Sequence, residues 1–172
     1  MTLKPELFQA ILAMDAYNRG YDAGIALNGD SIGSANIAKT EIDGIEVNFD
    51  SAIFRDSITN APLHDDIGFY ALAYDYNGET VISFRGTDKQ PLDGINGWLL
   101  GGGFYNAAQG PMAIDFYKEV AEADNGGFAI DPRFANISVT GHSLGGGLAG
   151  YVASLYGKEA DIFDSMTFED TA

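Results

Sequence analysis

The sequence predicts an α/β fold in which a mostly parallel sheet alternates with helices. Three patterns predict it: a pair of strands within 69–85, an amphipathic helix over 111–123, and a β-like run at 137–140 that leads directly into a helical stretch at 144–156. A helix that returns the chain from one strand to the next implies parallel pairing of those strands. The chain has 172 residues, of which 46% are hydrophobic, so we expect a single domain over 1–172 with a proper core.

The N-terminal third is expected to lie at the periphery of this domain. Apolar residues recur with helical spacing over 5–17, and Pro5 suits the first turn of a helix, so a covering helix is predicted there. Glycines punctuate the next segment, and the alternation of apolar and polar residues around a turn at 42–47 indicates a hairpin. Residues 1–60 are therefore predicted to form a peripheral helix and hairpin region.

Asn77-Gly78 separates two β-like runs, 69–76 and 81–84. Asn-Gly between such runs is the strongest short signal for a hairpin, because both residues tolerate the positive φ of a type I′ turn. The second strand is expected to end near Arg85, whose guanidinium we expect to pair with a carboxylate or with carbonyl groups. The glycine-rich stretch 90–110 is typical of a mobile flap with aromatic tips that covers an acyl site. We favour the alternative that these aromatic side chains pack into the domain and the glycines only turn the chain.

The β-like run at 137–140 leads into Gly141-His142-Ser143-Leu144-Gly145. The pattern G-x-S-x-G is weak alone, but here a strand precedes it and a helix follows it, as a nucleophile elbow requires. The sharp turn forces the serine into strained backbone geometry, and glycine is needed two residues before and after it because a Cβ would collide there. Ser143 is therefore the candidate nucleophile, at the positive end of the following helix, where an oxyanion is favoured.

Two motifs of this chain, Phe84-Arg85-Gly86-Thr87 and Gly141-His142-Ser143-Leu144-Gly145-Gly146, resemble those of the class 3 lipase family of the α/β-hydrolase superfamily. The similarity extends over about residues 69–168. It implies an α/β-hydrolase-like fold and a serine hydrolase that cleaves carboxylic esters, of lipids or of small molecules, through an acyl-enzyme on Ser143. It also implies that Thr87 and the backbone N–H of Leu144 form the oxyanion hole, and that His142 is not the catalytic base.

The triad of this family runs in the order serine, acid, histidine, but no histidine follows Ser143 in this chain. The stretch 165–168 resembles the strand that follows the nucleophile helix in relatives. The sheet is therefore expected to be incomplete at its C-terminal side. Four acids near the end of the chain all fall one strand too early by family order; they are Asp161, Asp164, Glu169 and Asp170.

Three explanations of the missing base stay open. The acid and the histidine could come from a segment outside these residues or from a separate chain. His64 could supply the base, because convergent triads tolerate any chain order. The chain could also be a catalytically silent hydrolase-like half-domain that associates with another polypeptide. An incomplete sheet exposes an edge, which favours a homodimer or a partner strand.

Composition excludes several function classes. The net charge of −16 repels phosphate backbones and anionic membrane surfaces, so nucleic-acid binding is not expected. No stretch approaches the apolar length of a membrane span, and no classical N-terminal signal peptide is present. The compartment stays open, and the resemblance to relatives that leave the cell by a C-terminal signal makes secretion compatible with this sequence.

No cofactor and no metal site are expected. Residues 145–150 formally match the dinucleotide fingerprint G-x-G-x-x-G, but its first glycine should follow the strand directly, so close packing of a helix on the sheet explains these glycines better. The acidic residues at 65–66 and 161–164 lack a twelve-residue calcium loop and are interpreted as solvated surface charge. Cysteine is absent, which excludes disulfides and thiolate metal sites.

Overall fold

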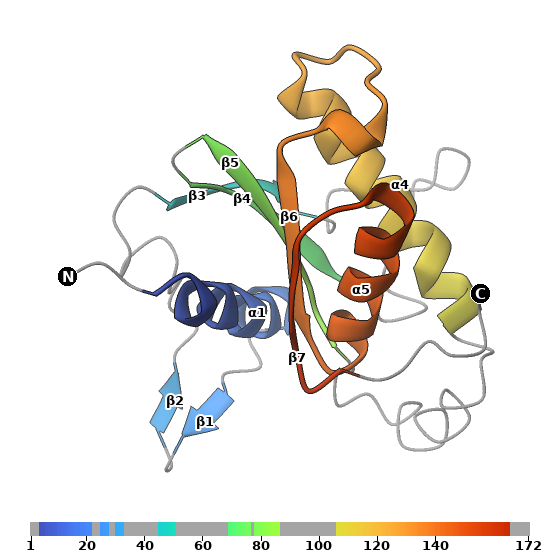
Figure 1. Cartoon of the computed structure of the whole chain (residues 1–172). Coiled ribbons are helices and arrows are strands. Elements are labelled where there is room, and N and C mark those ends of the chain that lie inside the picture. Colours follow the sequence, from blue (N-terminus) through green and yellow to red (C-terminus); the bar gives the residue numbers. More distant parts are fainter. Residues whose placement is uncertain are drawn as a thin grey trace.

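The computed structural model describes residues 4–21, 25–27, 30–32, 45–50, 69–76, 78–86 and 106–165 (Figure 1). In chain order the elements are α1 (Pro5–Tyr21), β1 (Ile25–Leu27), β2 (Asp30–Ile32), β3 (Ile45–Asp50), β4 (Ala71–Tyr76), β5 (Glu79–Phe84), α4 (Asn106–Asp124), the 3₁₀ helix η2 (Pro132–Phe134), β6 (Ile137–His142), α5 (Leu144–Tyr156) and β7 (Ala160–Phe163). β1 and β2 pair as a small antiparallel hairpin. The other five strands form one sheet.

The main sheet has the strand order β3-β4-β5-β6-β7. β4 is antiparallel to both β3 and β5, whereas β5, β6 and β7 are parallel to one another. Four of these five strands therefore point the same way, which confirms a mixed α/β fold with a mostly parallel sheet. β3, which contains residues 45–47 of the hairpin predicted at 42–47, pairs with β4 with a register shift between Val47 and Phe49. Residues 42–44 lie outside the described residues, so that hairpin stays a prediction.

β4 and β5 form the hairpin that the Asn-Gly pattern predicts. They pair in register from Ala71↔Phe84 to Tyr76↔Glu79, which leaves two residues for the turn. Gly78 has a φ of +82°, as a type I′ turn requires. Asn77 lies outside the described residues.

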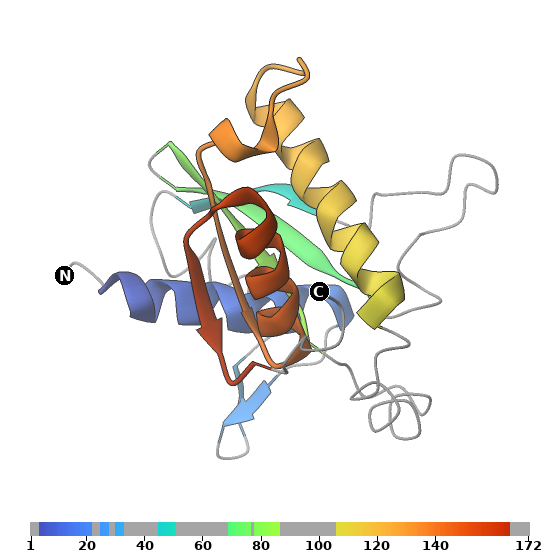
Figure 2. The same ribbon diagram turned by 45° about the vertical axis from the view of Figure 1, so that its right-hand side comes forward.

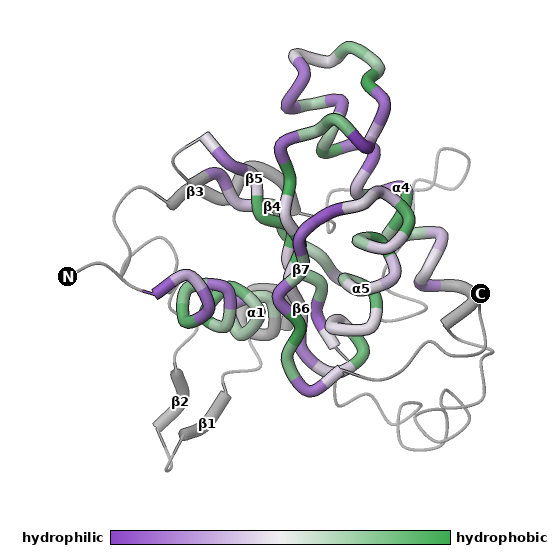
Figure 3. The backbone as a smooth tube through the Cα atoms, in the orientation of Figure 1, coloured by the Kyte–Doolittle hydropathy of each residue, from purple (hydrophilic) through white to green (hydrophobic). Residues whose placement is uncertain are grey.

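Helices cover both faces of the sheet (Figures 1 and 2). A larger core lies between the sheet and the helices α4 and α5, and Figure 3 shows hydrophobic residues along β6 and α5 where these layers meet. Because alternate residues of a strand face different helices, the central strands are apolar on both sides. On the opposite face α1 packs against the β4–β5 hairpin through a buried cluster of Phe8, Leu12, Ala16, Tyr70, Leu72, Tyr74 and Val81.

Polar contacts fix how α1 crosses the sheet. The hydroxyl of Thr140 on β6 lies 3.4 Å from the carbonyl of Gln9, and the hydroxyl of Ser83 on β5 donates to the carbonyl of Leu12 at 3.0 Å. The phenol of Tyr74 on β4 donates to the buried carboxylate of Asp15 at 3.0 Å. Successive turns of α1 therefore lie over β6, β5 and β4. The predicted covering helix exists, and it is part of the buried structure of the domain.

The crossover helix α4 begins earlier than predicted. The sequence pattern places its start at Pro111, but α4 begins at Asn106 and Pro111 lies inside it. The residues before the proline include Ala107 and Ala108, which favour a helix. The predicted flap at 90–110 is therefore wrong for its last five residues, and 90–105 lie outside the described residues.

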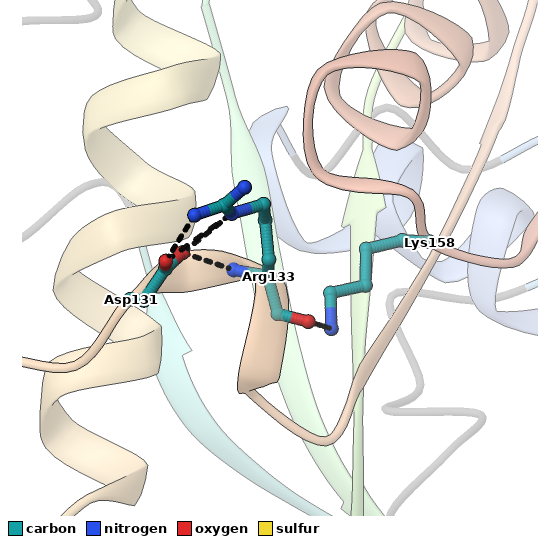
Figure 4. A network of polar contacts seen from close by, with 3 residues as sticks. All are labelled: Asp131, Arg133 and Lys158. Carbon is teal, nitrogen blue, oxygen red and sulfur yellow. Dashed lines mark hydrogen bonds and ion pairs between the residues drawn. The ribbon is translucent and has the colours of Figure 1, made fainter.

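Hydrogen bonds join the connection between α4 and β6 to the loop after α5 (Figure 4). The carboxylate of Asp131 accepts from the backbone N–H of Arg133 at 3.1 Å and pairs with its guanidinium at 2.6 Å. These hydrogen bonds to Arg133 lower the pKa of Asp131 to about 2. The ammonium of Lys158 donates to the carbonyls of Arg133, at 3.0 Å, and Ala135. This network lies at the amino ends of β6 and β7.

The strand after α5 comes earlier than the resemblance implies. α5 ends at Tyr156, and the left-handed φ of +64° at its cap residue Gly157 turns the chain. β7 then begins at Ala160, and it pairs with β6 from Val139↔Ala160 to His142↔Phe163. The expectation of this strand at 165–168 is wrong, because the two residues after Gly157 already return the chain to the sheet. Residues 166–168 lie outside the described residues.

Candidate active site

Ser143 lies at a sharp turn between the parallel strand β6 and the helix α5. It follows the last strand residue, His142, and precedes the first helix residue, Leu144. Its backbone has φ 56° and ψ −123°, a conformation that non-glycine residues rarely adopt. Strain of this kind persists only where the surroundings enforce it. The backbone of Ser143 therefore has the geometry expected of a nucleophile elbow.

Two glycines allow this turn because the backbone passes close to them. A Cβ on Gly141 would collide with the carbonyl group of Gly145, and a Cβ on Gly145 would collide with the carbonyl of Phe84 on β5. The atoms that would be struck are backbone atoms of packed elements, which cannot move aside as a flexible side chain could. The prediction that glycine is needed two residues before and two residues after the serine is confirmed.

The remaining helical glycines bring α5 close to β7. A Cβ on Gly146 would lie 2.9 Å from Cγ2 of Ile162, and one on Gly150 would lie 3.1 Å from its Cδ1. All glycines of the G-x-G-x-x-G match lie within α5. Gly145 and Gly150 of this match lie where α5 packs closely on the sheet, as the sequence predicts.

The backbone N–H and the carbonyl of Ser143 both form hydrogen bonds, and the residue is half-buried. Its N–H donates to the carbonyl of Phe163 on β7 at 3.0 Å, and its carbonyl accepts from the N–H of Gly147 at 3.1 Å. The side chain makes no capping hydrogen bond to α5, and the residue is half-buried. Two backbone hydrogen bonds therefore hold Ser143 in place at the carboxyl end of β6.

Hydrogen-bond donors for an oxyanion are available at the start of α5. An α-helix leaves its first N–H groups without partners inside the helix, and its amino end carries partial positive charge. Leu144 directly follows Ser143 and is the first residue of α5, so its backbone N–H is one of the groups without a partner inside the helix. Thr87, the other predicted oxyanion donor, lies outside the described residues.

The end of β5 lies next to the elbow. Phe84 pairs with Gly141 across the parallel strands β5 and β6. Arg85 follows it and is buried, with its guanidinium carbon 5.1 Å from the centre of the Tyr70 ring. The backbone N–H of Arg85 donates to the backbone carbonyl of Tyr70 at 2.9 Å. The contact described for this guanidinium is with an aromatic ring, and its predicted pairing with a carboxylate or carbonyl groups stays a prediction.

The histidine and acidic residues considered for the site lie on β6, at or after β7, or outside the described residues. His142 is half-buried at the end of β6, and Asp161 lies within β7. Asp164 follows the end of β7 directly and is exposed. His64 and the acidic residues at 65–66 lie outside the described residues. Within the part of the chain that the structure describes, no group of three or more His, Cys, Asp or Glu side chains could hold a metal ion.

A cleft of about 360 Å³ lies away from the elbow, at the amino ends of β5 and β6. Its polar groups are already bonded to one another. The hydroxyl of Thr80 donates to Asp124 at 2.6 Å, and the amide of Asn136 donates to the carbonyl of Gly78 at 3.0 Å. These hydrogen bonds stabilise this end of the sheet, and the cleft lies at the opposite end of β6 from Ser143.

Comparison with known proteins assigns the chain to a family of hydrolases. A family model described as "Phospholipase-like: Tle-like phospholipase domain" matches residues 9–171, which include the whole elbow. No curated protein and no solved structure matches the chain. Over the described helices, none has both the length and the apolar character needed to cross a bilayer.

Proposed function

The chain belongs to the family of Tle-like phospholipase domains, and on that premise we propose that it is a serine hydrolase that cleaves the carboxylic esters of phospholipids. Family membership indicates lipid hydrolysis in general. The observation that supports the finer proposal is the backbone of Ser143, a half-buried residue at a strand-to-helix turn with a φ of 56° and a ψ of −123°. Such strain serves the presentation of a nucleophile.

In the proposed reaction Oγ of Ser143 attacks the ester carbonyl, and its proton passes to an imidazole. The carbonyl oxygen becomes an oxyanion that accepts hydrogen bonds from the N–H of Leu144 and from Thr87. The carbon–oxygen bond to the leaving alcohol then breaks, and the alcohol takes the proton from the imidazolium. Water hydrolyses the acyl-enzyme by the same steps in reverse. Each well-placed oxyanion donor is worth about 10²–10³ in rate.

The position of β5 supports the assignment of Thr87. Phe84 pairs with Gly141, and the carbonyl of Phe84 touches Gly145 in the first turn of α5. Thr87 follows Phe84 by three residues. A residue that close to the end of β5 can reach the space in front of the elbow, so its N–H and hydroxyl suit an oxyanion there.

The mechanism requires a general base, and the chain contains two histidines, His64 and His142. His142 is the last residue of β6, and the resemblance assigns it no catalytic role. We propose that the imidazole is supplied either by His64 or by a segment of a partner or second copy beside β7. β7 ends the sheet at this side within the described residues, and an unpaired strand edge accepts such a segment.

The proposal is tested by product analysis with phosphatidylcholine vesicles and the complete gene product. Zwitterionic vesicles are chosen because a net charge of −16 is repelled by anionic lipid. We expect free fatty acid and lysophospholipid as products. Ser143→Ala should abolish their release, whereas Ser154→Ala, an exposed serine on the same helix, should leave it unchanged.

Release of a phosphorylated headgroup in place of fatty acid would contradict cleavage of the carboxylic ester. Full activity of Ser143→Ala would contradict the assignment of the nucleophile. A complete gene product that neither hydrolyses lipid nor acylates Ser143 would favour the alternative, a silent domain that associates with another polypeptide.

A further inference from the structure

Asp164 lies beside Ser143 at the same end of the sheet. β6 and β7 are parallel and in register up to the pair His142↔Phe163, so Ser143 and Asp164 are the next residues of neighbouring strands. The N–H of Ser143 donates to the carbonyl of Phe163, the residue bonded to Asp164, at 3.0 Å. Adjacent strands are about 5 Å apart, so these two residues leave the sheet side by side.

These two residues also share an unusual backbone conformation. Among the residues that the structure describes, Ser143 and Asp164 are the only non-glycine residues with positive φ, at 56° and 45°. At the other positive-φ positions of the described chain glycine is present, because it adopts this conformation without a steric cost. The two positions that keep a polar side chain despite this cost are therefore neighbours at the elbow.

Other acids near the serine are placed less well. Asp161 pairs with Thr140, within the sheet, and its carbonyl accepts from the Thr140 hydroxyl at 2.8 Å. Asp15 is buried beneath the sheet on α1, where it binds Tyr74. Asp164 is exposed, and its neighbour Ser165 lies against the first turn of α5, with its Cβ 3.2 Å from where a Cβ on Gly146 would stand.

From this placement we infer that Asp164 is the carboxylate that positions the imidazole base of the Ser143 site. This inference rests on the proposed function. The base gains a proton when Oγ of Ser143 attacks the ester, and a neighbouring carboxylate orients the ring and stabilises the imidazolium. Asp164 forms no covalent bond in this scheme. The resemblance implies an acid one strand later in the chain. The inference differs from it, because Asp164 directly follows β7, the neighbour of the strand that leads into Ser143.

The test measures how fast a fluorophosphonate labels Ser143 in the complete gene product, as a function of pH. Asn is isosteric with Asp and also tolerates a positive φ, so Asp164→Asn keeps the turn. We expect this variant to label about 10²–10⁴-fold more slowly. The pH midpoint of labelling should also move down, because loss of the carboxylate lowers the pKa of the imidazole. Asp164→Glu should recover part of the rate, and Asp161→Asn should label like the wild type.

The outcomes separate this inference from the proposed function. A wild type that labels at Ser143 while Asp164→Asn labels at the same rate and with the same pH midpoint would overturn the inference alone. A wild type that never labels at Ser143 would overturn both. Thermal unfolding of each variant shows whether a loss of labelling reflects loss of the fold.

Discussion

Gly145→Ala should show that the close approach of β5 to α5 builds the elbow. Gly145 is the second residue of α5, where alanine alone would favour the helix by about 1 kcal/mol. Its Cβ, however, would collide with the carbonyl of Phe84 and with backbone atoms of Arg85. Overpacking against rigid neighbours costs about 1–3 kcal/mol. Since the helix gain offsets part of this cost, we expect a net loss of up to about 2 kcal/mol in the free energy of unfolding, and a displaced Ser143.

Gly150→Ala is the matched control on the same helix. There the nearest atom to the new Cβ is Cδ1 of Ile162 at 3.1 Å, the flexible end of a side chain. The gain in helix propensity then decides the outcome, and this variant should be unchanged or up to about 1 kcal/mol more stable. Urea unfolding with a constant m-value measures both effects, and fluorophosphonate labelling reports on the serine. Equal stabilities and equal labelling of the two variants would refute the reasoning.

Three further predictions concern strain, a buried hydroxyl and pH. Ser143→Gly should relieve the backbone strain and stabilise the fold by about 1 kcal/mol while abolishing labelling, as thermal unfolding and labelling will show. Thr140→Val removes the hydrogen bond to the Asp161 carbonyl and should cost about 1 kcal/mol in urea unfolding. Burial raises the pKa of Tyr117, so this residue keeps its proton in the folded state while the unfolded chain loses it above pH 10. Stability should therefore fall in that range by at most about 1.4 kcal/mol per pH unit, and less steeply in Tyr117→Phe.

The elbow and the hairpin could be predicted from sequence because their signals are local. Asn77-Gly78 has few alternatives to a type I′ turn, and Gly141 and Gly145 flank a turn in which no other residue fits. The requirement at Gly145 is nonetheless set by Phe84, which is distant in the sequence. The motif thus encodes a tertiary contact that only the structure identifies.

The errors arose where partners and boundaries depend on distant residues. Alternation at 42–47 predicts a strand but not its partner, and the pairing of β3 with the distant strand β4 comes from the structure alone. Pro111 marks helix starts often, but the residues before it extend α4 to Asn106. The resemblance placed the strand after α5 at 165–168, but β7 is Ala160–Phe163. Because β7 comes early, Asp164 lies at its end, beside Ser143.

The most direct test of the central claim is peptide mapping of the complete gene product after reaction with a fluorophosphonate. The account predicts one adduct, on the peptide that contains Ser143, and its loss in Ser143→Ala with the fold intact. An adduct on another serine, or an unreacted Ser143 in protein that hydrolyses phospholipid, would contradict it.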